Sequence, residues 1–272
     1  MKKLITITTL LFLISVNAQV HRFYYELTYR PNKDSVKTEK DLMVLDVAKD
    51  ESVFVSYKQL EYDSIYISGI KKTEDMGQFI SPPASSAANL SFRINKLKNG
   101  KQIFKDFVGV SEFYSYEEKP DLKWKISSTK EKIGIHSTQK ATTDFGGRRW
   151  TAWFTTDIPI QDGPYKFSGL PGLIVKLEDS GANYSWILAG NKKLSQNIDL
   201  NKTNYMEYQM GKSVKLNKEG FQKRLNEYEQ NPMSQMLQMF DEKDAGLMKA
   251  LKQQEIRIKK QIAFYNNPIE IK

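Results

Sequence analysis

The sequence predicts a mainly β protein with an antiparallel, curved sheet (a half-barrel, a bowl or a sandwich) followed by C-terminal α-helices. Three observations lead to this prediction. Short segments of alternating apolar and polar residues recur through the first ~190 residues, and polar turns separate them. The spacing of apolar residues changes to three and four after residue 217. No helical crossovers are visible between the strand-like segments, so we expect antiparallel pairing.

The composition excludes several classes of function. The chain has 272 residues, of which 40% are hydrophobic and 27% are charged, as in ordinary globular proteins. Cysteine is absent, which excludes disulfides, thiolate metal sites and catalytic thiols. The two histidines, His21 and His136, are too few for a histidine-rich metal site. We therefore expect neither a metal nor another cofactor.

The formal net charge is +9, but lysines and acidic residues alternate along the chain, as in residues 37–41. Such mixing is typical of a solvated surface and not of a phosphate-binding track. We expect no nucleic-acid partner, and at most weak contact with anionic polymers of the cell envelope.

The first 18 residues have the pattern of a signal peptide. Lys2 and Lys3 precede an uncharged apolar run from Leu4 to Val16, and Ala18 offers a small residue for cleavage before Gln19. The run is shorter than the ~20 residues that a membrane span requires. The sequence therefore predicts a cleaved signal peptide (1–18), export to the periplasm or the cell exterior, and no transmembrane span in the mature chain (19–272).

Strand-like segments follow in order along the mature chain. They are 23–29, 42–47, 52–57, 92–94, 103–108, 113–116, 124–126, 133–136, 149–155, 173–177 and 184–188. A hairpin is expected around Lys49-Asp50. The proline-containing stretch 77–89 predicts a long loop within a single domain (19–272), with a linker between two domains as the alternative.

The last quarter of the chain predicts helices over about residues 217–262. Asn217 is a suitable N-cap for a helix over 218–230, and Asn231-Pro232 ends that helix. Methionines recur at helical spacing after residue 232, which is typical of an adaptable core. A second helix is expected over 241–261, and the tail 266–271 leaves it and adds a short strand.

Residues 145–190 contain the densest local constraints. In the strand 149–155, Trp150 and Phe154 share one face, while Arg149 and Trp153 share the other. The segment Gly169-Leu170-Pro171-Gly172 predicts a type II turn, because proline presets φ at the second position and glycine accepts a positive φ at the third. The strand 173–177 then leaves this turn.

The hexapeptide Gly169-Leu170-Pro171-Gly172-Leu173-Ile174 resembles the motif that names the GLPGLI family of exported Gram-negative bacterial proteins. The segments that resemble other parts of this family are 147–155, 158–160, 163–167 and 267–270. One departure is visible, since many members carry a cysteine where this chain has Gln139. The resemblance implies an exported, β-rich accessory protein with no assigned activity.

A hydrolase acting on peptides or glycans is one alternative. His136 is its best general base, with Ser137, Thr138, Ser168 or Asp157 around it. Paired carboxylates are a second route to hydrolysis, and the candidates are Asp144, Asp157, Asp162, Glu178 and Asp179. All of them lie beside turns, so we expect them to cap backbone amides. No pair of residues has the spacing of metal ligands.

The sequence favours a non-enzymatic envelope or secreted module that binds a ligand or an envelope protein. Aromatic residues on sheets stack against sugars, peptides or lipids. Trp153 shares a polar strand face with Arg149, and Tyr165 follows in the next segment, so these three are the candidate ligand contacts. A carrier of a hydrophobic molecule within a concave β-structure is the other alternative.

Overall fold

The computed structural model describes residues 20–76, 90–109, 112–194, 212–239 and 245–271. The predicted signal peptide and the loop 77–89 lie outside these ranges. One sheet of twelve strands has the order β12-β6-β5-β4-β3-β2-β1-β11-β10-β9-β8-β7. The strands are β1 (His21–Tyr29), β2 (Glu39–Val47), β3 (Glu51–Ser56), β4 (Arg93–Leu97), β5 (Gln102–Val108), β6 (Glu112–Glu118), β7 (Lys125–Ile133), β8 (His136–Phe145), β9 (Arg148–Thr155), β10 (Leu173–Asp179), β11 (Tyr184–Lys193) and β12 (Val214–Leu216).

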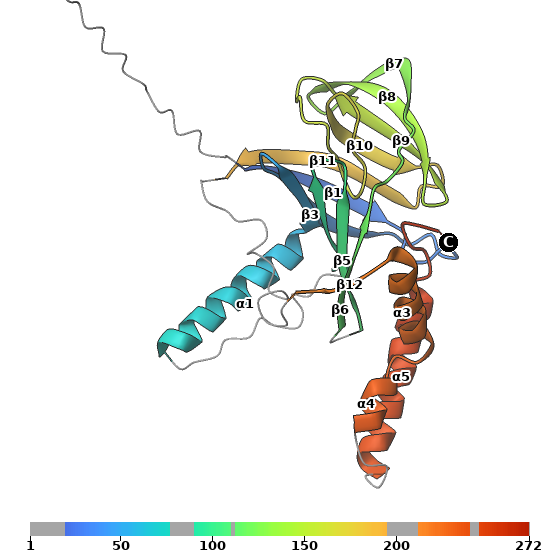
Figure 1. Cartoon of the computed structure of the whole chain (residues 1–272). Helices are drawn as coiled ribbons and strands as arrows, with labels where there is room; N and C mark the ends of the chain where they lie inside the picture. Colours follow the sequence, from blue (N-terminus) through green and yellow to red (C-terminus); the bar gives the residue numbers. More distant parts are fainter. Residues whose placement is uncertain (1–19, 77–89, 110–111, 195–211, 240–244, 272) are drawn as a thin grey trace, which may run out of the picture.

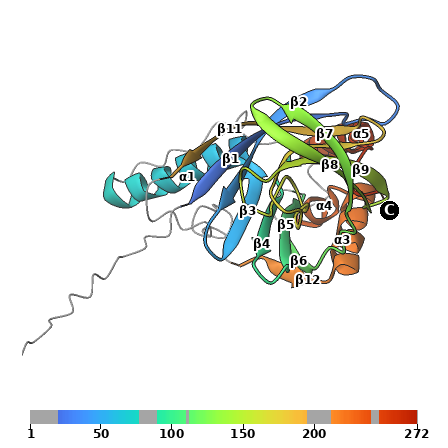
Figure 2. The ribbon, with the colours of Figure 1, turned by 90° about the horizontal axis from the view of Figure 1, so that it is seen from above.

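The sheet is open, strongly curved and antiparallel at every pairing except one. In Figure 1, β5 and β6 run steeply across the direction of β1 and β11, and Figure 2 shows the strands from above. The prediction of a mainly β, antiparallel protein is confirmed. The exception is β12, which pairs in parallel with β6. A parallel pair needs a long connection, and here about 100 residues of chain separate the two strands.

The predicted strand at 133–136 is wrong. Ile133 pairs with His136 at the closed end of the β7–β8 hairpin, and Gly134 has a φ of +58° within this turn. Strand β8 begins only at His136. It was not predicted, because most of its residues are polar and no apolar residues alternate along it. The hairpin around Lys49-Asp50 is confirmed as the connection between β2 and β3.

Helix α1 (Tyr57–Met76) follows β3 directly and is absent from the predicted elements. Its tyrosines and isoleucines favour a strand by local propensity, whereas its tertiary contacts favour a helix. The carboxylate of Asp63 lies 3.3 Å from Arg93 of β4, and both side chains are buried. This ion pair joins the helix to the sheet.

The C-terminal helices are α3 (Lys218–Gln230), α4 (Ser234–Met239) and α5 (Ala245–Phe264). The prediction of α3 is confirmed: the Asn217 side chain accepts a hydrogen bond of 2.8 Å from the Gly220 N–H. The tail 266–271 was predicted to add a strand, but it forms none. None of the helices in the described ranges is long and apolar enough to cross a membrane.

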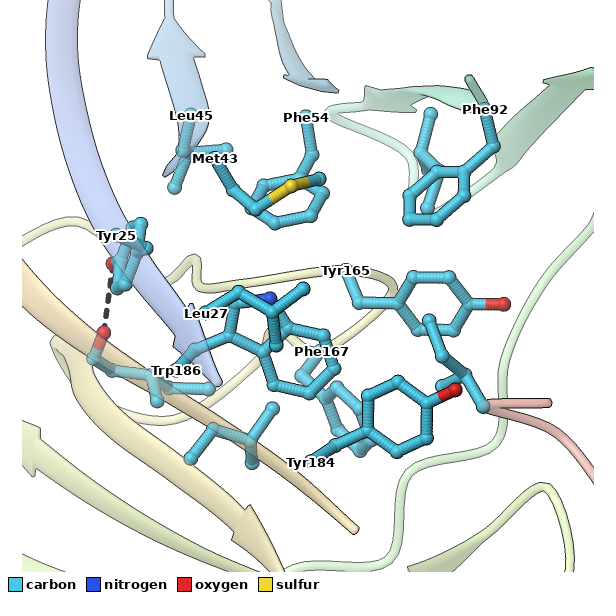
Figure 3. Close-up of a cluster of buried hydrophobic side chains, with 14 of the residues drawn as sticks. Tyr25, Leu27, Met43, Leu45, Phe54, Phe92, Tyr165, Phe167, Tyr184 and Trp186 are labelled. Atoms are coloured by element: carbon cyan, nitrogen blue, oxygen red, sulfur yellow. Dashed lines mark hydrogen bonds between the residues drawn. The ribbon is translucent and has the colours of Figure 1, made fainter. Parts of the chain in front are cut away.

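The connection between β9 and β10, residues 156–172, folds back into the concave face of the sheet; we call it the plug loop. Tyr165 and Phe167 are buried there among side chains of β1, β2, β3 and β11 (Figure 3). Asp162 accepts hydrogen bonds from Ser52 of β3 and from Lys96 of β4, at 2.5 and 2.7 Å. The loop therefore joins the two halves of the curved sheet through buried polar and apolar contacts.

The predicted type II turn is wrong in its geometry. The Gly172 N–H donates to the Leu170 carbonyl at 2.7 Å, which closes a tighter, three-residue turn around Pro171. Leu173 donates instead to the Ile158 carbonyl at 3.1 Å. Glycine is still required at 172, because φ is +156° and a Cβ there would lie 2.0 Å from the Thr155 carbonyl oxygen.

Candidate functional site: an aromatic pocket

A pocket of about 310 Å³ opens where the sheet, the plug loop, α3 and the C-terminal tail meet. Nine aromatic side chains line it: Tyr29, Phe92, Phe104, Phe107, Tyr116, Tyr165, Tyr184, Phe221 and Tyr265. We call it the aromatic pocket. Its remaining lining includes the charged groups Asp106, Lys218 and Glu270. Apolar walls with a few polar groups are typical of small-molecule sites.

The strand register determines which aromatic rings lie side by side on the inner wall of the pocket. Phe104 of β5 lies opposite Tyr116 of β6, and their rings stack with centroids 5.0 Å apart. Phe221 of α3 meets Phe104 edge-on at 5.7 Å, and Phe92 meets Tyr165 edge-on at 5.4 Å. Helix α3 thus packs against β5 and β6, while the plug loop packs against the residue that precedes β4.

Behind these rings lies a group of two lysines and two glutamates, Lys166, Lys218, Glu118 and Glu270, which we call the ion quartet. Lys166 is fully buried and contacts both carboxylates, and Lys218 lies 2.9 and 2.7 Å from them. Burial opposes ionisation of Glu270, but the two ammonium groups outweigh it and lower its pKa. The quartet is neutral as a whole.

The tail reaches the pocket because Arg148 of β9 binds it. The guanidinium donates to the Asn267 side chain, to the Pro268 carbonyl and to the Ile269 carbonyl, at 2.6, 2.7 and 3.0 Å. Asp179 holds the same guanidinium at 3.0 Å. These contacts place Glu270 beside the plug loop, so the end of the chain completes the pocket wall.

Asp106 differs from the other charged groups of the pocket. Its carboxylate accepts hydrogen bonds from the Ser91 hydroxyl at 2.6 Å and from the Phe107 N–H at 2.8 Å. Both bonds reach Oδ1, and within the described residues no cation pairs with this side chain. Burial raises its pKa from 3.8 to about 6, because the two hydrogen bonds only partly offset the loss of water.

The substitution Asp106→Asn is expected to stabilise the protein at neutral pH. The folded-state pKa of about 6 lies above the ordinary value of 3.8, so the native state gains stability as pH falls through this interval and loses it as pH rises. At pH 7 the charged form costs about 1–3 kcal/mol, which the amide avoids. Urea unfolding at pH 4 and pH 7 checks this: the gain should appear at pH 7 and shrink at pH 4, and a loss at pH 7 would contradict it.

The three predicted ligand contacts do not come together. Tyr165 lines the aromatic pocket, on the concave face. Trp150 packs against Phe167 of the plug loop at 4.9 Å, so alternation along β9 places Arg149 and Trp153 on the convex face. Trp153 is only 7% exposed there, and the Lys140 ammonium lies over its ring at 5.9 Å.

His136 lies at the start of β8, and the described structure gives it no hydrogen bond to a serine, threonine or carboxylate. Ser137, Thr138 and Asp157 line a separate depression of about 380 Å³ that His136 does not line. The Thr138 hydroxyl donates to the Glu131 carbonyl at 2.6 Å. The predicted hydrolytic arrangement around His136 is therefore not assembled.

The carboxylates beside turns mostly have structural partners. Asp162 accepts from the Gly163 N–H, and Asp179 accepts from the N–H groups of Asn183 and Tyr184, as predicted for acids that cap backbone amides. Glu178 pairs with Lys176 at 2.9 Å. The described residues contain no cluster of three or more potential metal ligands. Gln139, at the position of the family's cysteine, donates to the Ser127 carbonyl at 2.6 Å.

Asp106, Lys218 and Glu270 were not predicted as site residues. Asp106 carried a signal, because Phe104, Asp106 and Val108 share one face of β5 and an acid there interrupts an apolar row. Lys218 carried none, since it lies in a polar stretch. Glu270 stands between Ile269 and Ile271 in the tail segment that resembles the family, and it joins the pocket only through the packing of the tail.

These observations define a mainly β protein whose open, curved sheet holds its own plug loop and carries an aromatic pocket. The family model described as "Protein of unknown function (Porph_ging)" matches residues 146–176 and corresponds to the GLPGLI family. The resemblance is confirmed over this stretch, which covers β9, the plug loop and the start of β10. No curated protein matches the sequence of this chain.

Solved structures of PNGF-II, a peptide:N-glycanase, are similar in fold. The C2 crystal form gives a TM-score of 0.52 at 14% identity, and the P21 form gives 0.52 at 13%. Each match covers 76% of this chain and 33% of PNGF-II. The matched part of the chain thus corresponds to about a third of PNGF-II, and at this identity the likeness concerns the fold alone.

Proposed function

We propose that this protein is an exported, non-enzymatic binding module whose ligand enters the aromatic pocket. The pocket itself carries the proposal: nine aromatic side chains and a small number of polar groups converge where the sheet, the plug loop, α3 and the tail meet. Such a surface offers stacking and a few directional hydrogen bonds, which is how small ligands and peptide side chains are recognised.

The arrangement of polar groups supports binding over turnover. Lys218 and Glu270 are already engaged in the ion quartet, and the Tyr165 hydroxyl donates to Glu270 at 2.8 Å. A similar fold makes up about a third of PNGF-II, so this fold can form one module of a larger protein. This supports a binding module that acts together with other domains or partners. Within the described ranges, Tyr165 and Phe167 of the plug loop are buried in the concave face, which favours a filled interior over the apolar cavity that a carrier requires.

Substitution Leu225→Trp tests the proposal, because Leu225 of α3 lines the pocket and is only partly buried. The larger ring is expected to fill the space and to abolish binding of any ligand found by screening the purified protein against glycans, peptides and amines. Lys223→Trp is the matched control, since it adds the same ring at an exposed position of the same helix. Equal binding by both variants, at unchanged melting temperatures, would place the ligand elsewhere.

The proposed export is tested separately. Expressed in a Gram-negative host with its own N-terminus, the protein is expected outside the cytoplasm, and sequencing of its N-terminus should begin at Gln19. A cytoplasmic product that keeps Met1 would contradict export.

A further inference from the structure

The charge balance of the aromatic pocket indicates the kind of ligand, if the pocket is the binding site proposed above. The ion quartet contributes two positive and two negative groups, so it leaves the pocket without net charge. Asp106 adds one negative charge that no cation of the described residues balances. The pocket is therefore acidic, although the net charge of the whole chain is +9.

The Asp106 carboxylate can accept one more hydrogen bond. The Ser91 hydroxyl and the Phe107 N–H both donate to Oδ1, so the two bonds fix the orientation of the carboxylate. Oδ2 accepts no hydrogen bond from the part of the chain that the structure describes, and the residue lines the pocket. A cationic donor would find here both a free acceptor and a charge complement.

The surrounding rings already hold ammonium groups of the chain itself. The Lys166 Nζ atom lies 4.9, 5.1 and 5.3 Å from the ring centroids of Phe104, Tyr116 and Tyr165. Lys218 lies 5.8 Å from the Tyr116 centroid. Aromatic faces attract cations most strongly where water is excluded, and these distances are within the range of that interaction.

We propose that the aromatic pocket binds an organic ammonium ion, with its charge against Asp106 Oδ2 and its carbon skeleton against the aromatic rings. A lysine side chain of a peptide and a small aromatic amine share this chemistry. Neutral molecules of the same shape gain the apolar contacts but leave the carboxylate unpaired. The ammonium group therefore provides selectivity.

Calorimetric titration of the purified protein with two matched pairs of probes tests this proposal. The peptide-like pair is Nα-acetyl-lysine methylamide and Nα-acetyl-norleucine methylamide, and the small-molecule pair is phenethylamine and 2-phenylethanol. We expect at least one ammonium probe to bind about tenfold more tightly than its neutral partner. The pair that shows this difference identifies the source of the ammonium group.

Asp106→Asn is expected to remove this preference, so that the ammonium probe falls to the affinity of its neutral partner. The amide keeps both acceptor bonds at Oδ1 and is expected to raise stability, so lost affinity will not reflect unfolding. Asp144→Asn, at an exposed position of β8, is the control and should retain the full preference.

Three results would overturn the inference: no binding of either ammonium probe, equal affinity within both pairs, or an unchanged preference in Asp106→Asn. Binding of the neutral probes as tight as or tighter than that of the ammonium probes, or binding of a methyl glycoside alone, would reject the ammonium ligand; if Leu225→Trp abolishes that binding, the proposed binding pocket is supported. Ligand binding that Leu225→Trp leaves intact would reject both.

Discussion

Substitution Gly172→Ala should destabilise the protein by about 3–5 kcal/mol, the largest loss expected from a single methyl group. The added Cβ would lie 2.0 Å from the Thr155 carbonyl oxygen and 2.7 Å from its carbon. Both are backbone atoms at the end of β9, so no side chain can rotate away to make room. The φ of +156° adds strain for any residue with a side chain.

Gly169→Ala is the matched control, because it lies in the same hexapeptide and also has a positive φ, +88°. No atom lies within 4 Å of the Cβ that it would acquire, so only conformational strain remains, about 1 kcal/mol. Urea unfolding monitored by tryptophan fluorescence measures both variants. Similar losses would show that the close approach to Thr155 does not determine the requirement for glycine.

Substitution Lys166→Met should cost about 3–5 kcal/mol, because it removes a buried cation and leaves two carboxylates with a single ammonium group. Glu118 and Glu270 would then share only Lys218. The methionine preserves much of the apolar stem, so the loss reports the charge more than the packing. The measurement is again the free energy of unfolding.

The double variant Lys166→Met/Glu270→Gln tests whether the loss of stability comes from the unbalanced charge in the ion quartet. Removing one charge of each sign restores neutrality, so the double variant should lose less free energy than the sum of the single variants. Lys101→Met is the control, because Lys101 pairs with Glu117 at 2.8 Å on the exposed surface and such a pair contributes about 0–1 kcal/mol. Strict additivity of the two buried substitutions would contradict direct coupling in the ion quartet.

The same quartet predicts a loss of stability in acid. The pKa of Glu270 is lowered in the folded protein, chiefly by Lys166 against the opposing effect of burial. The quartet therefore stabilises the native state above the ordinary pKa of 4.5, and this contribution is lost as pH falls. Asp106 acts in the opposite sense, so the two groups give the native state opposite responses to pH.

The tail links stability to the proposed binding pocket in this structure. Arg148 fixes the tail, and the tail carries Glu270 to the quartet and closes one wall of the aromatic pocket. The expected gain of stability in Asp106→Asn together with a loss of ligand affinity is the pattern of a group retained for binding.

Local patterns determined much of the fold in advance. Alternation located most strands, because a half-buried strand repeats every two residues. The Asn217 cap located the start of α3, because its side chain satisfies a free N–H of the first turn. Patterns failed at β8, whose face is polar, and at α1, where tertiary packing overrides the propensity of its residues.

The sequence by itself determined most of the strands, the C-terminal helices and the hexapeptide that carries the family resemblance, since each depends on residues close together in the chain. Tertiary structure alone decided that the plug loop enters the concave face, that Tyr165 and Trp153 lie on opposite faces, and that Asp106, Lys218 and Glu270 line one pocket. Alternation shows which residues share a face of a strand, but curvature of the whole sheet determines which face is concave. Asp106 lies more than 100 residues from Lys218 and from Glu270, which are themselves 52 residues apart, and only packing brings the three together.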